Sequence, residues 1–110
     1  MLSLSCLGRR GDMPKRTNDF QKLIYVIKQN LADDAEVKES KLLRDLVTGA
    51  EREVDVCIKK PVGGHLVTIS VECRDRERPA HVGWVEEMIK KHERLPTNVL
   101  VLVSAGGLSS

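Results

Sequence analysis

Two acidic residues interrupt apolar segments of the sequence in a pattern that brings them together. Asp55 lies in "REVDVCI" and Glu72 in "TISVECRD", on either side of Gly63-Gly64. A Gly-Gly pair favours a two-residue hairpin loop, and the resulting register places the two acids directly opposite each other. Their Cβ atoms would then be about 4.5–5.5 Å apart. Pro61 leaves open a longer loop or a bulge, which would separate them.

Opposed carboxylates repel each other unless water, a proton or a cation lies between them. A hard divalent cation such as Mg²⁺ suits this place, because it prefers oxygen ligands and keeps several of its waters. The same pattern also fits a simpler interpretation. An antiparallel hairpin often has one buried and one solvated face, and the acids would then point into water.

Hydrophobic periodicity predicts the elements that must position these acids. Helical spacing of apolar residues predicts helices from Asn18 or Asp19 to about Leu31, and from Ala80 to Glu93 after Pro79. Alternation predicts strands over Arg52–Lys60 and Leu66–Arg74. The run Val99–Val103 is apolar throughout, which predicts a strand covered on both faces. The segment "EVKESKLLRDLVTG" fits a strand or extended arm ending at Gly49 better than a helix.

The order helix, three strands, helix, strand is typical of an α/β fold. Residues 1–12 are interpreted as a disordered leader, and residues 13–110 as one domain. The 41% hydrophobic and 31% charged composition is that of an ordinary globular protein. No apolar run approaches the roughly 18–20 residues that span a membrane. The three cysteines lack CxxC spacing, which argues against a zinc site and for a reducing, cytoplasmic location.

An acid on one strand followed by an acid-x-basic triplet at the end of the next resembles the PD-(D/E)XK nuclease superfamily. Asp55 and the triplet Glu72-Cys73-Arg74 carry the resemblance, which covers about residues 20–107. It implies a restriction-endonuclease-like core, a mixed sheet with a central hairpin flanked by helices on both faces. The family includes Mrr-like restriction enzymes and Holliday-junction resolvases. Further helices often follow this core, so the chain is interpreted as truncated at its C-terminus.

In that family the two acids bind the metal and the basic residue, usually Lys, orients or activates the attacking water. The resemblance therefore implies that Asp55 and Glu72 bind Mg²⁺ or Mn²⁺, and that Arg74 contacts phosphate. Two positions depart from the pattern. Arg74 replaces the lysine and does not readily give up a proton, so Lys91 would supply an amine if its helix faces the site. Gln21 stands where some members carry an auxiliary acid.

The sequence thus predicts a Mg²⁺-dependent DNA endonuclease. It leaves open whether the protein forms a homodimer. Two alternatives remain: a non-cutting DNA-binding or assembly module of the same fold, and a small α/β interaction domain. Arg74, Arg76 and Arg78 are further candidates for phosphate contacts. The three histidines are interpreted as surface residues, and Trp84 as packing the second helix onto the sheet. Glu36 and Glu39 are weighed as further metal ligands but interpreted as solvated charges.

Overall fold

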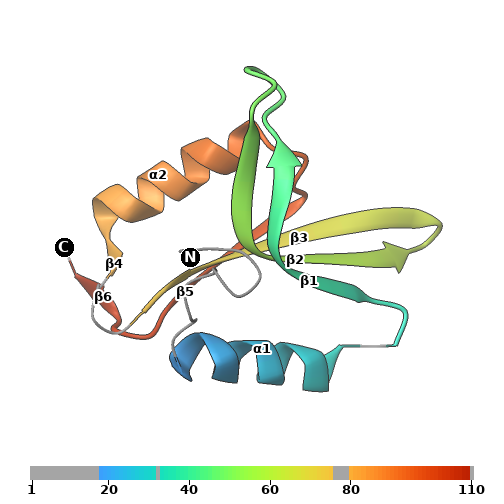
Figure 1. Cartoon of the computed structure of the whole chain (residues 1–110), viewed down its shortest axis with the longest axis horizontal. Helices are drawn as coiled ribbons and strands as arrows, with labels where there is room; N and C mark the ends of the chain where they lie inside the picture. The colour runs from blue at the N-terminus through green and yellow to red at the C-terminus, as the bar shows by residue number, and fades with distance from the viewer. Residues whose placement is uncertain (1–17, 32, 76–79, 110) are drawn as a thin grey trace, which may run out of the picture.

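A four-stranded mixed sheet forms the centre of the molecule in the computed structural model, which describes residues 18–31, 33–75 and 80–109 (Figure 1). The strand order is β1-β2-β3-β5. Strands β1, β2 and β3 are antiparallel to their neighbours, and β5 runs parallel to β3. The sheet strands are β1 (Glu36–Arg44), β2 (Glu51–Val62), β3 (His65–Arg74) and β5 (Val99–Ser104). The other elements are the helices α1 (Asn18–Asn30) and α2 (Val82–Glu93) and the short parallel pair β4 (Ala80–His81) and β6 (Leu108–Ser109).

The Gly63-Gly64 turn fixes the register of the central hairpin. Both glycines have positive φ, 57° and 84°, which is the backbone of a type I′ turn. Val62 pairs with His65, and the ladder runs from there to Val56 and Val71. The predicted register is therefore confirmed over this ladder, and Pro61 fits into it without a longer loop.

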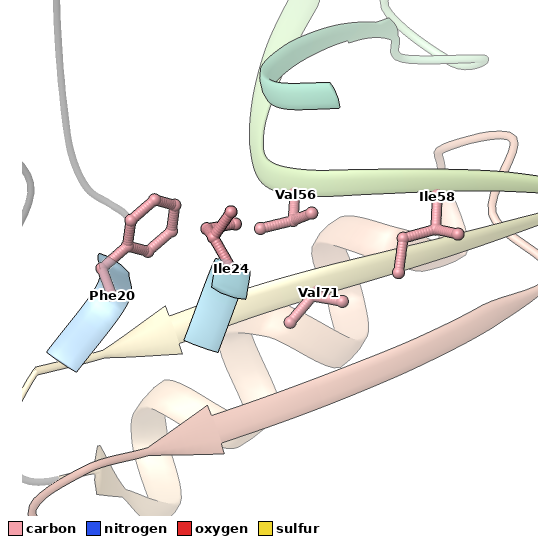
Figure 2. Packing of buried hydrophobic residues seen from close by; sticks show 5 residues of the cluster. All are labelled: Phe20, Ile24, Val56, Ile58 and Val71. Carbon is pink, nitrogen blue, oxygen red and sulfur yellow. The ribbon is translucent and has the colours of Figure 1, made fainter. Parts of the chain in front are cut away.

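Helix α1 covers one face of the sheet. Phe20 and Ile24 on α1 pack against Val56, Ile58 and Val71, all of which are buried (Figure 2). Val56 pairs directly with Val71, and Ile58 lies two residues along β2 from Val56, so the three side chains share one face. Burying five large apolar side chains in this way stabilises the fold by roughly 1.5–3 kcal/mol for each side chain.

Helix α2 covers the opposite face, where the polar residues of the hairpin lie. Trp84 on α2 is buried, as predicted. Asp55, Cys57, Ser70 and Glu72 are also buried, at 2%, 2%, 0% and 4% exposure. The interpretation of this face as simply solvated is wrong, because α2 and the residues that follow it lie against it. The α/β class is confirmed, with one helix on each face of the sheet.

The sheet forks immediately beyond the last backbone pair of the central hairpin. The β2–β3 ladder ends at Val56 and Val71. Strand β2 continues to Glu51 paired with β1, and β3 continues to Arg74 paired with β5. Figure 1 shows the two branches diverging, with β1 and β2 turning away from β3 and β5. We call this point the fork, and Asp55 and Glu72 are the first residues beyond it on β2 and β3.

Strand β1 follows β2 through the fork without changing register. Glu39 pairs with Val56 before the fork and Lys41 with Val54 after it. Ser40, between them, has a φ of 52°, which is uncommon for a residue other than glycine. This left-handed backbone conformation at Ser40 lets β1 bend together with β2 without a bulge, so the register stays the same on both sides. The ambiguous segment is thus a strand, which ends at Arg44 rather than at Gly49.

Two sequence predictions about the C-terminal elements need correction. Helix α2 begins at Val82, because Ala80 pairs with Leu108 in the β4–β6 ladder instead of starting the helix. Strand β5 is not covered on both faces. Val99 and Val101 are 45% and 39% exposed, because β5 is an edge strand at the side of the sheet. The predicted leader, residues 1–12, and the residues Arg76 and Arg78 lie outside the described part of the chain.

A buried carboxylate closes the connection between β1 and β2. Asp45 is 1% exposed, and its Oδ1 accepts hydrogen bonds from Val47 N (2.8 Å) and Thr48 N (2.9 Å). The bond from the Thr48 N–H is the largest influence on its pKa, and with Val47, Arg94 and Arg52 it outweighs burial and lowers the pKa. The ionised form therefore stabilises this turn.

We expect Asp45 to make the fold sensitive to acid. A group whose pKa is lowered by folding contributes stability above its unfolded pKa of about 3.9, and that stability is lost as the pH falls through the folded pKa. Wild type should thus lose more thermal stability between pH 5 and pH 2.5 than Asp45→Asn, which keeps an acceptor oxygen but has no charge. Asp33→Asn, at an exposed acid, is the control. Parallel melting-temperature curves for wild type and Asp45→Asn would contradict this role.

Candidate functional site

The carboxylates of Asp55 and Glu72 replace backbone pairing at the fork. Asp55 Oδ2 accepts a hydrogen bond from Cys73 N at 2.9 Å, across to β3. In the other direction, Glu72 Oε1 lies 3.5 Å from Asp55 N on β2. Each side chain thus reaches the backbone of the opposite strand just where the two strands separate. Buried N–H groups that leave a ladder need acceptors, and the two acids supply them.

Lys91 from α2 supplies the positive charge that the two acids require. Its Nζ lies 2.8 Å from Glu72 Oε2 on β3 and donates to the backbone oxygen of Glu53 on β2 at 2.6 Å. Its side chain is only 11% exposed and that of Glu72 5%. One ammonium therefore joins both branches of the fork to the helix. A buried cation of the chain itself thus compensates the negative charge of Glu72.

A chain of hydrogen bonds extends from Glu72 away from the fork. His92 Nε2 lies 2.7 Å from Glu72 Oε2, and His92 Nδ1 lies 3.0 Å from Thr97 Oγ1. Thr97 Oγ1 is in turn 2.9 Å from Ser70 Oγ. An ionised carboxylate only accepts, so Nε2 donates to Glu72, and in a neutral imidazole Nδ1 accepts from Thr97. The chain holds Glu72 Oε2 in a fixed position.

These contacts keep Glu72 ionised although it is buried. Burial alone, the largest influence, would raise the pKa of Glu72. The hydrogen bond from His92 and the charge of Lys91 act in the opposite direction and together lower the pKa below its usual value. The site therefore contains a buried carboxylate that stays charged because charge-assisted hydrogen bonds compensate for its lost hydration.

Arg74 lies two residues beyond Glu72 on the same face of β3, but its guanidinium is directed at α2. Its Cζ lies 5.3 Å from the centre of the Trp84 ring, within the range of a cation–π contact. Arg74 Nε is buried and, within the part of the chain that the structure describes, has no hydrogen-bond partner. The pairing of Arg74 with Glu53, which the register would give, lies beyond the fork, where β2 and β3 have separated.

In many proteins Mg²⁺ is held by one or two carboxylates and otherwise by water and phosphate. Within residues 18–31, 33–75 and 80–109, no group of three or more His, Cys, Asp or Glu side chains could hold a metal ion. Asp55 and Glu72 are the two oxygen ligands that the sequence analysis assigned to Mg²⁺ or Mn²⁺, and hard oxygen donors are the type that these ions prefer. Glu36 and Glu39 are exposed on β1.

The structure brings together two of the three predicted site residues and joins them to Lys91 and His92. Asp55 and Glu72 meet at the fork, while Arg74 stacks on Trp84. Lys91 faces the site. The sequence analysis assigned Lys91 as a source of an amine only if its helix faces the site, and that condition is met. The interpretation of His92 as a surface residue is wrong, since it is 7% exposed and bonded to Glu72.

A helical signal for the added residues is present in the sequence. Trp84, Lys91 and His92 are separated by seven and eight positions, a spacing that places them on one face of a helix. Because Trp84 is apolar and faces the sheet, the same face carries Lys91 and His92 to it. Thr97, in the connection between α2 and β5, belongs to no periodic pattern and has no comparable signal.

Comparison with known proteins shows a likeness of fold only. No family model matches the sequence, and no curated protein matches it. A crystal structure of a protein of unknown function, AF1548, superposes with a TM-score of 0.63 at 11% sequence identity. The match covers 84% of this chain and 48% of that one, so this chain spans about half the length of the protein it resembles. Among the described residues, no helix is long and apolar enough to cross a membrane.

Removal of the Lys91 charge should destabilise the fold strongly. Lys91→Met leaves Glu72 buried without its ammonium partner, a change that typically costs about 3–5 kcal/mol. We expect a loss of about 3 kcal/mol in the free energy of unfolding, measured by urea denaturation at pH 7. Adding Glu72→Gln to Lys91→Met should recover part of the loss, because the uncompensated charge is then removed as well.

Lys90→Met is the matched control, since Lys90 is the exposed neighbour on the same helix. Its effect should stay within about 0.5 kcal/mol, as for most surface substitutions. If Lys91→Met were as mild as Lys90→Met, the ammonium would not be the group that compensates the buried carboxylates.

Proposed function

We propose that this domain is a metal-dependent nuclease that hydrolyses phosphodiester bonds in DNA. The observation that carries the proposal is the meeting of Asp55, Glu72 and Lys91 at the fork, from β2, β3 and α2. Two carboxylates and a lysine are the groups that metal-assisted attack of water on a phosphodiester requires. They come from segments separated by 17 and 19 residues and are brought together by the fold.

A restriction-endonuclease-like core is part of the same proposal. The order α1, β1, β2, β3, α2, β5 and the mixed sheet support it, with the acids on neighbouring antiparallel strands as the resemblance implies. The position of Lys91 accounts for the unusual triplet ending in Arg74. The amine usually carried by the third residue of the triplet is supplied here from the helix that packs over it.

In this mechanism Asp55 and Glu72 would hold a Mg²⁺ ion, which would supply Lewis-acid stabilisation of the phosphate. Lys91 places a positive charge beside Glu72 and stabilises negative charge as it develops on the phosphate. His92 fixes Glu72 Oε2 through the bond described above, so that the carboxylate does not rotate. Arg74 contributes a guanidinium for a neighbouring phosphate.

A second function, DNA binding without cleavage, is favoured by a separate observation. Asp55 and Glu72 are 2% and 4% exposed, and their oxygens already accept bonds from Cys73 N, Lys91 and His92. Carboxylates engaged in this way serve the fold whether or not a metal binds. In that case the same site would be structural, and the protein would bind DNA through its basic side chains alone.

Cleavage of labelled DNA with Mg²⁺ or Mn²⁺ separates the two functions. We expect wild type to cut, and Asp55→Asn and Glu72→Gln to lower the rate by at least about 100-fold, the loss typical when a charge-stabilising group is removed from an active site. Glu86→Gln, at an exposed acid on α2, should cut like wild type. Circular dichroism confirms that each variant is folded.

Substitution of Lys91 distinguishes the nuclease from the DNA-binding module most clearly. Lys91→Arg keeps the positive charge beside Glu72, so it should retain the fold and a large part of the activity, whereas Lys91→Gln, which removes that charge, should lose most of the activity. Arg74→Lys should keep activity or raise it. Binding by wild type without cleavage, under both metals, would reject the nuclease and leave the binding module.

A further inference from the structure

The connection between α2 and β5 is held beside β3 by backbone bonds. The Thr68 N–H donates to Asn98 Oδ1 at 2.8 Å, and the Asn98 N–H donates to the Thr68 carbonyl at 2.9 Å. The Thr97 N–H donates to the carbonyl of Leu95 at 2.7 Å, and Leu95 is itself buried. Bonds on both sides of Thr97 therefore fix the place of this residue relative to β3.

This placement puts the Thr97 hydroxyl between Ser70 and His92. Thr97 Oγ1 lies 2.9 Å from Ser70 Oγ and 3.0 Å from His92 Nδ1, and both of these partners are buried. The direction of the bonds follows from Glu72, because an ionised carboxylate only accepts and His92 Nε2 must donate to it. Nδ1 of the neutral ring then accepts from Thr97. The Thr97 hydroxyl has one hydrogen, so it accepts from Ser70.

The two oxygens of Glu72 are held differently. Oε2 lies 2.7 Å from His92 Nε2 and 2.8 Å from Lys91 Nζ, so two donors hold it in place. Oε1 lies 3.5 Å from Asp55 N, which is longer than the about 2.7–3.2 Å of an ordinary N–H···O bond. The contacts of α2 therefore hold one oxygen firmly and leave the other, on the side of Asp55, more weakly bonded.

We infer that Thr97 is a positioning residue of the proposed metal site, because its hydroxyl aims His92 Nε2 at Glu72 Oε2 and thereby presents Glu72 Oε1 to the ion. This inference rests on the proposed function, to which it adds a residue that acts on a metal ligand through a histidine. A carboxylate held in one orientation loses less freedom when it binds an ion. Hydrogen-bond partners that orient metal ligands typically contribute about 10–100-fold to metal affinity or activity.

The first measurement is the NMR spectrum of the His92 ring in the metal-free protein at pH 8. Wild type should carry the ring hydrogen on Nε2, with a slowly exchanging N–H signal, whereas the exposed His65 should show both tautomers. Thr97→Val keeps the branched shape and removes the hydroxyl. The His92 N–H should then exchange with water about 10-fold faster, as expected for the loss of one hydrogen bond. Thr97→Ser restores a hydroxyl and should restore slow exchange.

The second measurement is the affinity for Mn²⁺ alone, titrated into the protein without DNA and followed by the electron paramagnetic resonance of the free ion. Thr97→Val should bind Mn²⁺ about 10-fold more weakly than wild type, and Thr97→Ser should bind it like wild type. Thr48→Val is the matched control, because Thr48 is exposed on the connection between β1 and β2 and its hydroxyl accepts only from Ala50 N, at 3.2 Å, among the described contacts. This control should change neither measurement.

The outcomes separate this inference from the proposed function. A ring hydrogen on Nδ1 of His92 in wild type overturns the inference without any substitution. Equal Mn²⁺ affinity of wild type and a folded Thr97→Val, or equal losses in Thr97→Val and Thr97→Ser, also overturn it, even if wild type cleaves DNA. If Mn²⁺ binding depends on Thr97 as expected but wild type never cleaves, the nuclease is rejected and the role of Thr97 stands. If wild type does not bind Mn²⁺, both are rejected.

Discussion

The contact of one ammonium group with two strands determines how the rest of this fold is organised. Lys91 Nζ contacts the Glu72 carboxylate on β3 and the Glu53 carbonyl on β2, where the two strands have already separated. A sheet that divides exposes backbone donors and acceptors that its ladder no longer pairs, and leaving them buried without partners is costly. Here a helix residue and two acids supply the missing partners, so the fork and the packing of α2 depend on each other.

The same group of contacts explains how so many polar atoms are buried in a small domain. Buried ion pairs gain little net stability unless their geometry is good and their remaining hydrogen bonds are made. Glu72 meets both conditions through Lys91 and His92. Such an arrangement also keeps a carboxylate, a lysine and a histidine in fixed positions, and fixed charge is what stabilises a charged transition state without reorganisation. The structural role and the proposed catalytic role therefore require the same geometry.

The sequence predicted the central hairpin well, because its signals are local. Gly63-Gly64 specifies the turn, and the alternation in β2 and β3 then fixes which residues are paired. What the sequence could not show is the fork, which depends on where β1 and β5 draw the two strands apart. The burial of Asp55 and Glu72 follows from α2, which begins 27 residues after Asp55, and the exposure of Val99 and Val101 follows from the place of β5 at the edge. These features depend on contacts between segments that lie far apart in the sequence, and a local sequence pattern does not record such contacts.

The buried thiol of Cys57 can report how often the strands around it separate. The side chain is 2% exposed, and its pKa is raised by burial despite the neighbouring lysines, so the reactive thiolate is scarce in the closed protein. Alkylation of Cys57 would therefore proceed chiefly through momentary separation of the strands around it. Cys73, on the other face and half-buried, supplies an internal reference. The two alkylation rates together would measure how often the sheet opens beside the fork, and no residue has to be substituted to make the measurement.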